Sequence, residues 1–253
     1  MKHGDFQWFD LMTTDTKAAA AFYGAVVGWV VQDSGLPGMD YALLLVEGQG
    51  AGGIMPTPAE AAGHPPAWSA YVAVDDVDAA ARKVASLGGA VLREPWDVPG
   101  VIRLALVADP QGAGFLLGKG LAEGAMPGFA PHTVGAAGWY ELMAGDWAAV
   151  FPFYEALFDW TKADAFDMGE MGTYQLFAHG GPPIGGMMTK PPQVPAPHWN
   201  IYFNVESAAA AAERVKAGGG KVLMGPHQVP TGEWIVQGQD PQGAFFCLLS
   251  DKA

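Results

Sequence analysis

The sequence contains a single cysteine, Cys247, so no disulfide can form within one chain. A chain without disulfides suits a reducing compartment such as the cytosol. Long apolar runs are also missing, since no stretch approaches the ~18 residues that a membrane-spanning helix needs. The first residues, Met1–Asp5, do not read as the apolar part of a secretion signal. These absences predict a soluble, cytoplasmic protein without a membrane partner.

Basic residues are scarce as well. The chain has 13 Lys and Arg against 26 Asp and Glu, which gives a formal net charge of −13. Such an acidic surface repels phosphate backbones, and no cluster of Lys and Arg offers a local exception, so we expect no nucleic-acid partner. Charged residues make up only 15% of the chain and hydrophobic residues 50%, which predicts a packed core and not a disordered chain.

Histidines are few and show no paired spacing. They are His3, His64, His132, His179, His198 and His227. A protein metal site needs several converging His, Cys, Asp or Glu side chains. We therefore interpret these histidines as solvated loop residues and expect neither a metal ion nor another cofactor.

What the sequence does contain is a repeat with a long period. Asp109–Ala113 and Asp240–Ala244 both read Asp-Pro-Gln-Gly-Ala, at an offset of 131 positions (240 minus 109). The same offset pairs Trp8 with Trp139, Phe22-Tyr23 with Phe153-Tyr154, Trp29 with Trp160, Trp68 with Trp199, Gly89 with Gly220 and Pro95 with Pro226. Between Tyr41/Tyr174 and Gly53/Gly186 the offset is 133 (174 minus 41). A period of about half the chain indicates two tandem copies of one domain and not a solenoid.

Each Asp-Pro-Gln-Gly copy is predicted to form a tight turn. Proline presets φ at the second turn position, aspartate can cap its own backbone, and glycine accepts positive φ. The turns are flanked by apolar runs at Ile102–Ala108 and Gly114–Leu117 in the first copy, and at Trp234–Val236 and Ala244–Leu249 in the second. This pattern predicts a β-hairpin that closes each half.

Within each copy, a strand, a helix and three short strands occur twice in succession. In the first occurrence, the strand Phe6–Met12 leads to a helix that Thr14 or Asp15 caps and Gly28 ends. Three short β tracts follow, and a Pro-rich connection leads to the next occurrence of the same pattern.

The pattern predicts an α+β fold. We place the first domain at residues 1–121, a linker at 122–135 and the second domain at 136–253.

One residue departs from the repeat. Pro152 falls about six residues into the helix expected from Asp146 to Phe158. Proline in a helix interior removes a backbone hydrogen bond and costs about 3 kcal/mol. We therefore expect this helix to be kinked or to start late.

Taken together, these motifs resemble a known superfamily. The resemblance is carried by paired β-α-β-β-β units, by Phe-Tyr and then Gly-Trp around the first helix, by Gly-Gly after the second helix, and by Asp-Pro-Gln-Gly before the last strand. The whole chain looks like a tandem member of the vicinal oxygen chelate superfamily, which includes glyoxalase I, extradiol dioxygenases and bleomycin-resistance proteins. The resemblance implies that the eight strands of each domain form a U-shaped sheet around a cup that binds the ligand.

In metal-dependent members of this superfamily, His, Gln or Glu on the first, fourth, fifth and eighth strands hold a divalent ion. The resemblance places these positions at Trp8, Ile54/Met55, Ser69 and Leu116 in the first repeat, and at Trp139, Met187/Met188, Asn200 and Cys247 in the second. None of them is His or Glu. Trp and Leu cannot ligate a metal, and a lone Cys or Asn cannot hold one. The sequence therefore predicts that neither repeat has the superfamily metal centre.

Two acidic residues are candidates for catalysis or ligand anchoring. Side chains two apart on a strand share a face, so Asp10 should join Trp8 inside the first cup and Glu141 should join Trp139 inside the second. A carboxylate in such a place can bind a ligand donor or act as a general base. The alternative is that each carboxylate hydrogen-bonds neighbouring backbone or closes an ion pair at the rim.

The same alternation predicts the remaining ligand-binding residues. They are Trp8, Ser69 and Tyr71 for the first cup, and Trp139, Asn200, Tyr202 and Asn204 for the second, more polar one. Aromatic walls with few hydrogen-bonding groups suit a small, largely apolar ligand. Ordinary sheet packing, with the tyrosine hydroxyls reaching local partners, is an equally good interpretation. Cys247 reads as a buried small hydrophobe and not as a nucleophile.

The leading functional hypothesis is a glyoxalase-like protein that binds a small, largely apolar or aromatic molecule without the family metal. Such a protein would sequester its ligand or perform acid/base chemistry from Asp10 or Glu141. The alternative is a metal-dependent lyase, isomerase or extradiol-type dioxygenase of the same superfamily. We expect a monomer or a homodimer.

Overall fold

The computed structural model describes residues 2–36, 38–121 and 128–253. It contains four β-α-β-β-β modules, two in each sequence repeat. Module 1 consists of β1 (Phe6–Thr13), α1 (Thr16–Val27), β2 (Val30–Asp33), β3 (Ala42–Val46) and β4 (Gln49–Pro56). Module 2 consists of β5 (Ala67–Ala73), α2 (Val77–Ser86), β6 (Ala90–Val98), β7 (Ile102–Ala108) and β8 (Gly114–Gly120).

The second repeat has the same plan. Module 3 consists of β9 (Ala137–Ala144), α3 (Trp147–Phe158), β10 (Thr161–Asp167), β11 (Thr173–Ala178) and β12 (Pro183–Thr189). Module 4 consists of β13 (His198–Asn204), α4 (Ala208–Ala217), β14 (Lys221–Gln228), β15 (Trp234–Gln239) and β16 (Phe245–Ser250). Short 3-10 turns lie at Ala59–Ala61 and Gly169–Met171. The predicted linker, 122–135, lies partly outside the described residues.

Each repeat forms one eight-stranded sheet, so the predicted α+β fold with two tandem domains is confirmed. The strand order is β2-β3-β4-β1-β5-β8-β7-β6 in the first sheet and β10-β11-β12-β9-β13-β16-β15-β14 in the second. The sheets are mixed: β1 pairs with β4 and β5 with β8 in parallel, whereas the hairpins are antiparallel. The predicted hairpins around the two Asp-Pro-Gln-Gly turns are present as β7–β8 and β15–β16.

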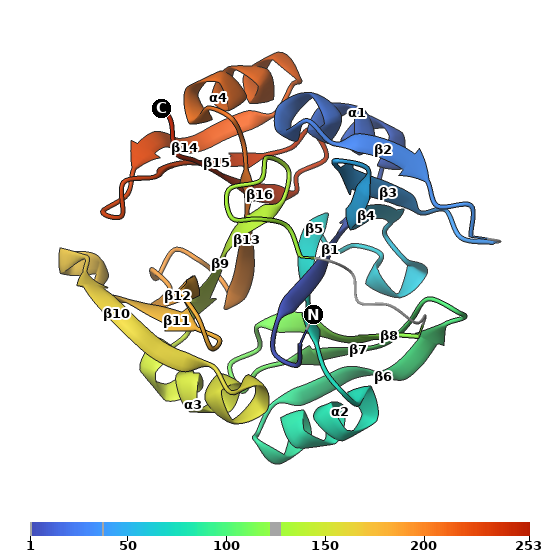
Figure 1. The fold of residues 1–253 in the computed structure, drawn as a ribbon, viewed down its shortest axis with the longest axis vertical. Helices are drawn as coiled ribbons and strands as arrows, with labels where there is room; N and C mark the ends of the chain where they lie inside the picture. Colours follow the sequence, from blue (N-terminus) through green and yellow to red (C-terminus); the bar gives the residue numbers. More distant parts are fainter. Residues whose placement is uncertain (1, 37, 122–127) are drawn as a thin grey trace. The chain divides into compact units, whose positions relative to one another are not determined.

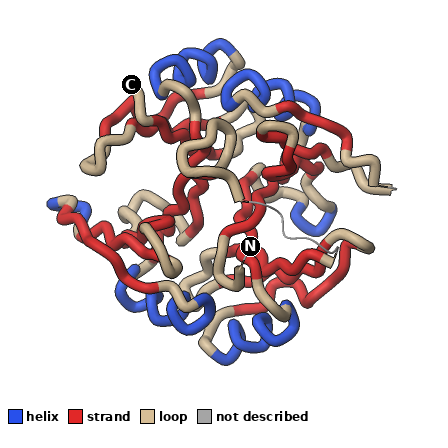
Figure 2. The backbone as a smooth tube through the Cα atoms, in the orientation of Figure 1, coloured by secondary structure: helices blue, strands red, loops and turns tan. Residues whose placement is uncertain are grey.

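The chain also forms two compact units, and each unit combines one module from each repeat. Unit 1 holds the described residues of 1–7, 70–128 and 140–200, and unit 2 holds those of 8–69, 129–139 and 201–253. Helices α2 and α3 pack together in unit 1, and α1 and α4 pack together in unit 2 (Figure 1). Within each unit the helices lie on one face of the strands (Figure 2).

The repeated residues explain how the modules of unit 1 are joined. The Asp109 carboxylate caps its own turn, because Oδ1 accepts from the backbone N–H groups of Gln111 (2.8 Å) and Ala113 (3.0 Å). Its Oδ2 accepts from the Tyr154 hydroxyl at 2.9 Å, and that hydroxyl accepts from Trp199 Nε1 at 3.1 Å. We call Asp109, Tyr154 and Trp199 the unit 1 triad. Asp109 belongs to the first repeat and the other two to the second, so the triad ties the repeats together.

Unit 2 has the corresponding triad of Asp240, Tyr23 and Trp68. Asp240 Oδ2 accepts from the Tyr23 hydroxyl at 3.1 Å, and that hydroxyl accepts from Trp68 Nε1 at 3.1 Å. Burial raises the pKa of Tyr23, and the negative charge of Asp240 raises it further, so the phenol stays neutral and donates. Burial also raises the pKa of Asp240, against the opposing effect of its backbone and tyrosine hydrogen bonds.

The phenylalanines of the Phe-Tyr pairs fit against glycines of the other repeat. A Cβ at Gly89 would lie 3.0 Å from the Phe153 ring, and one at Gly220 would lie 2.9 Å from the Phe22 ring. Both distances are shorter than ordinary van der Waals contact, so the glycines allow the ring to approach the backbone. Five of the repeated pairs therefore join a module of one repeat to a module of the other: Phe22/Phe153, Tyr23/Tyr154, Trp68/Trp199, Gly89/Gly220 and Asp109/Asp240.

The predicted helix boundaries are largely confirmed. Asp15 caps α1 by accepting from the Ala18 N–H, and Gly28 ends that helix in the left-handed region at φ 95°. Of the two alternatives expected for α3, a kink or a late start, the late start is wrong. That helix begins at Trp147, because Asp146 caps it and Gln111 holds the cap through two reciprocal 2.9 Å hydrogen bonds. Pro152 lies on the exposed side of α3.

We predict that replacing Pro152 with alanine stabilises the protein by about 1–3 kcal/mol, because α3 regains a backbone donor in its interior. The repeat offers a matched reciprocal change: Ala21 occupies the corresponding exposed position of α1, and Ala21→Pro should destabilise by a similar amount. Urea denaturation of both variants measures the two changes. An unchanged or lower midpoint for Pro152→Ala would mean that α3 accommodates proline without strain.

Candidate functional site

Strand β1 separates core residues from candidate site residues by simple alternation. Phe9 and Leu11 are 3% and 0% exposed, and the Phe9 ring packs against Trp29 and Phe203. Trp8 and Asp10 point to the opposite face. Asp10 is nevertheless buried, and its Oδ1 accepts from Trp8 Nε1 at 2.9 Å. The prediction that Trp8 and Asp10 lie together is confirmed.

Tyr41 completes this group and was not singled out from the sequence. Its hydroxyl donates to Asp10 Oδ1 at 2.6 Å and accepts from Trp8 Nε1 at 2.8 Å. Burial raises the pKa of Tyr41, and the charge of Asp10 raises it further, so Tyr41 remains a neutral donor. The three side chains, which we call the Asp10 network, hold one carboxylate oxygen between two neutral donors. The repeat could have pointed to Tyr41, because a tyrosine recurs at the corresponding position of the second copy, Tyr174.

Glycines in β4 make room for this network. The Tyr41 hydroxyl and ring occupy the space that a Cβ at Gly53 would need, and the Trp8 ring lies 3.0 Å from the Cβ position of Gly50. In unit 1, Tyr174 lies over Gly186 in the same way. The Tyr and Gly residues that share the offset of 133 are therefore stacking partners, Tyr41 with Gly53 and Tyr174 with Gly186.

The second predicted carboxylate, Glu141, has a different partner. It is 6% exposed, and its Oε2 accepts from Asn200 Nδ2 at 3.0 Å, with Asn200 itself 5% exposed. The core side chains of β9 alternate with it, since Leu142 and Ala144 belong to the hydrophobic core of unit 1. The structure thus brings together two predicted site residues that the sequence placed on different strands.

Tyr202 and Trp139 lie together in unit 2. Tyr202, Ile235 and Cys247 form a small buried cluster, against which Trp139 packs as a partly buried side chain. The Tyr202 hydroxyl accepts from Gln237 Nε2 at 3.0 Å. Cys247 is fully buried, in agreement with its interpretation as a small hydrophobe.

The remaining predicted ligand-binding residues have less distinctive surroundings. Ser69 is half-buried on β5, and Tyr71 is buried in register with Leu116 of β8. The Asn204 side chain has a structural partner, because its Nδ2 donates to the Thr133 carbonyl at 3.2 Å and it fills the space beside Gly138. A ligand-binding role for these three residues remains a prediction.

The chemistry at the positions implied by the superfamily does not fit a divalent ion. The Trp8 indole nitrogen carries a proton and donates it to Asp10 and Tyr41. Asn200 uses its amide N–H towards Glu141, and Leu116 has no donor atom. Within residues 2–36, 38–121 and 128–253, no three His, Cys, Asp or Glu side chains lie close enough to hold a metal. We therefore derive no reaction step through a metal.

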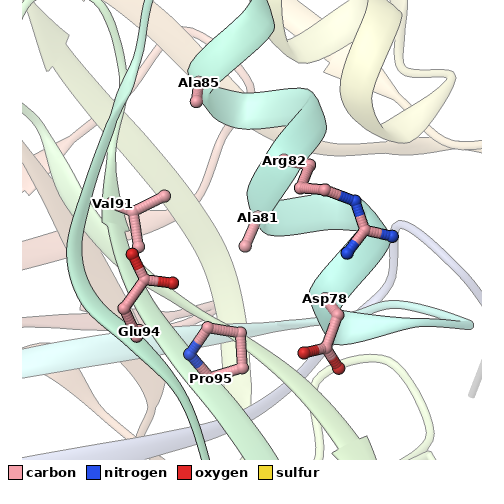
Figure 3. A pocket seen from close by; sticks show the side chains of 7 residues that line it. All are labelled: Asp78, Ala81, Arg82, Ala85, Val91, Glu94 and Pro95. Carbon is pink, nitrogen blue, oxygen red and sulfur yellow. The ribbon is translucent and has the colours of Figure 1, made fainter.

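A surface groove lies between α2 and β6 in unit 1. Figure 3 shows Asp78 and Arg82 of α2 on one side, and Glu94 and Pro95 of β6 on the other. Arg103 forms a salt bridge to Asp78 at 2.7 Å, and this hydrogen bond lowers the pKa of the Asp78 carboxyl. Because Arg82 and Glu94 are exposed to water, the groove lacks the desolvated polar groups typical of a ligand site.

None of the helices described by the structure is long and apolar enough to cross a membrane.

Both halves of the chain match a known protein family in sequence. Residues 5–117 and 136–248 each match the family model of the Glyoxalase/Bleomycin resistance protein/Dioxygenase superfamily. The putative glyoxylase CFP32 of Mycobacterium tuberculosis (strain CDC 1551 / Oshkosh) is 34% identical over 252 residues, which cover 98% of this chain and 95% of that protein. The anthracycline biosynthesis protein DnrV of Streptomyces peucetius is 34% identical over 262 residues, which cover 96% of this chain and 91% of that one.

Solved structures agree on the fold. The Mn(II)-bound glyoxalase from Novosphingobium aromaticivorans superposes with a TM-score of 0.68 at 18% identity, covering 100% of this chain and 83% of that one. The 2,3-dioxygenase LapB from Pseudomonas sp. KL28 gives a TM-score of 0.67 at 13% identity, covering 100% and 94%. At these identities the likeness concerns the fold alone.

Proposed function

The chain belongs to the Glyoxalase/Bleomycin resistance protein/Dioxygenase superfamily, and from that premise we propose that it binds a small, flat aromatic molecule without using the superfamily metal. In this proposal each repeat has its own site: the buried carboxylate of Asp10 anchors a donor group of the ligand in the first, and that of Glu141 does so in the second. The first site takes aromatic walls from Trp8 and Tyr71 and a polar contact from Ser69. The second takes aromatic walls from Trp139 and Tyr202 and polar contacts from Asn200 and Asn204.

The observation that carries the proposal is the Asp10 network. A buried carboxylate is costly unless it is hydrogen-bonded, and here two neutral donors hold it from 2.9 Å and 2.6 Å. This hydrogen-bonded group stands on the strand where the superfamily's first metal ligand would be. A fixed carboxylate beside an indole and a phenol offers a negative charge and two ring faces, which suits a flat ligand with a hydroxyl or cationic group.

The relatives support an aromatic ligand over other small molecules. Two of them are named for anthracycline biosynthesis, and they align with nearly the whole chain. Anthracyclines contain flat fused aromatic rings, which is the shape that aromatic walls favour. The name of the mycobacterial relative, putative glyoxylase, favours the metal-dependent alternative instead, and metal analysis separates the two.

We predict that Asp10→Asn and Glu141→Gln each weaken the binding of an anthracycline probe, daunorubicin, by about tenfold. Each change removes the charge but keeps an oxygen that accepts the existing hydrogen bonds, so the fold should survive. Titration followed by probe fluorescence measures the affinity, and Asp40→Asn, at an exposed position, serves as the matched control. Stoichiometric Zn, Ni, Fe or Mn in the untreated protein, lost together with activity on chelation, would favour the metalloenzyme instead.

A further inference from the structure

The neighbouring strands β13, β16 and β15 direct alternate side chains to the two faces of their sheet. On the helix side, Phe246 of β16 packs against Phe22 and Tyr23 of α1. Val236 of β15 and Leu248 of β16 are also fully buried. By alternation, the intervening side chains of β15 and β16 point to the face turned away from the helices.

On that second face, large apolar side chains gather where a solvated sheet face would be polar. Tyr202 and Cys247 are buried there, and Trp139, Met224 and Leu249 lie partly buried around them. Antiparallel or mixed sheets that meet water on one face usually alternate apolar and polar side chains. Large, partly exposed apolar side chains together with an aromatic pair are instead typical of the lining of a ligand site.

Gln237 adds an amide beside these apolar side chains. Gln237 of β15 is half-buried, and its Nε2 donates to the Tyr202 hydroxyl at 3.0 Å, which fixes the orientation of the amide. Register places Tyr202, Cys247 and Gln237 in one row across β13, β16 and β15. An oriented primary amide presents a carbonyl acceptor and a second N–H donor side by side.

The first repeat provides an internal comparison. At the same offset its row reads Tyr71, Leu116 and Leu106, again in register across β5, β8 and β7. Both rows keep the tyrosine, but leucine occupies the positions of Cys247 and Gln237. The amide is therefore a specific feature of the second repeat and is not required by the fold, since the same row closes with leucines in the first.

We infer that Gln237 is a specificity-determining residue, and that the face carrying Tyr202, Cys247 and Gln237 binds the hydroxylated edge of an aromatic or quinone ring. A ring hydroxyl would donate to Gln237 Oε1, a neighbouring ring oxygen would accept from Nε2, and Trp139 and Tyr202 would contact the ring. The corresponding row of the first repeat, Tyr71, Leu116 and Leu106, has no amide that could hydrogen-bond such an edge. This inference rests on the proposed function, because both require an aromatic ligand.

Two anthraquinone probes test it. Alizarin red S carries two neighbouring hydroxyls, and anthraquinone-2-sulfonate has the same ring system and sulfonate without them. Gln237→Leu, which copies the first repeat, should weaken alizarin red S binding by about five- to tenfold, as expected for lost hydrogen bonds. Binding of anthraquinone-2-sulfonate should change less than about twofold. Calorimetric titration of the intact protein measures both affinities.

Gln228→Leu is the matched control, because Gln228 is an exposed glutamine on β14 whose Nε2 donates to the Gly232 carbonyl. It should leave both affinities unchanged. Gln237→Met keeps the side-chain length without the amide and should reproduce the selective loss if Gln237→Leu folds poorly. Equal losses for both probes, or no loss, would overturn the inference alone. If the wild-type protein binds neither probe, the proposed function fails and this inference fails with it.

Discussion

Asp109→Ala is expected to lower the free energy of unfolding by about 3–5 kcal/mol. The Asp109 carboxylate is 2% exposed and accepts three hydrogen bonds, two within its turn and one from Tyr154. Alanine leaves the Tyr154 hydroxyl and the Ala113 N–H without this acceptor in a buried place. Because the unit 1 triad joins the two repeats, the loss weakens the turn and the module packing at once.

Denaturant unfolding at neutral pH measures the change. Asp240→Ala removes the corresponding carboxylate of unit 2 and should have a similar effect, whereas Asp40→Ala, at an exposed position, should stay within about 0.5 kcal/mol of the wild type. If Asp109→Ala behaved like Asp40→Ala, the triad would not stabilise unit 1. Tyr154→Phe should give a smaller loss than Asp109→Ala, because it removes only one of the three hydrogen bonds.

Gly53→Ala is expected to destabilise the protein by about 3 kcal/mol or more and to abolish ligand binding that depends on Asp10. A Cβ at Gly53 would overlap the hydroxyl and ring of Tyr41. Overpacking of this kind costs typically about 1–3 kcal/mol. Displacing Tyr41 also breaks its 2.6 Å hydrogen bond to Asp10, and hydrogen bonds to charged groups contribute about 1.5–3 kcal/mol.

Chemical denaturation and probe titration on the same preparation measure the two effects. Gly120→Ala in β8 is the control, because nothing lies within 4 Å of its Cβ position. Tyr41→Phe separates the two causes, since it removes the hydrogen bond without adding an atom at Gly53. If Gly53→Ala kept the stability and ligand affinity of the wild type, Tyr41 would be able to move away without cost. The intact Asp10 network would then not be needed for stability or for ligand binding.

The candidate site could be predicted from the sequence only in part. Alternation along β1 was enough to place Trp8 beside Asp10, because side chains two apart on a strand share a face whatever the tertiary structure. Tyr41 was not predicted, because it is 31 residues from Asp10 in the sequence and only the tertiary structure brings the two side chains into contact. The Glu141–Asn200 hydrogen bond spans 59 residues and likewise depends on how strands from two modules are arranged.

The α3 helix shows a similar limit. The Pro152 position alone suggested a kink or a late start, because proline disfavours a helix interior. The start is set by Asp146 and by its reciprocal hydrogen bonds with Gln111, a residue of the other repeat. A capping partner that arrives from a distant part of the chain cannot be read from local sequence.

The sequence by itself determined the tandem repeat, the four β-α-β-β-β modules and the two Asp-Pro-Gln-Gly hairpins, because turn chemistry and hydrophobic periodicity are local properties. Only the tertiary structure decided that the repeated residues bind across the repeats. Asp109 meets Tyr154 and Asp240 meets Tyr23, so each compact unit takes one module from each copy. The physical reason is that both repeats carry the same donors, acceptors and glycine spaces, and identical residues leave open whether they pair within a copy or between copies.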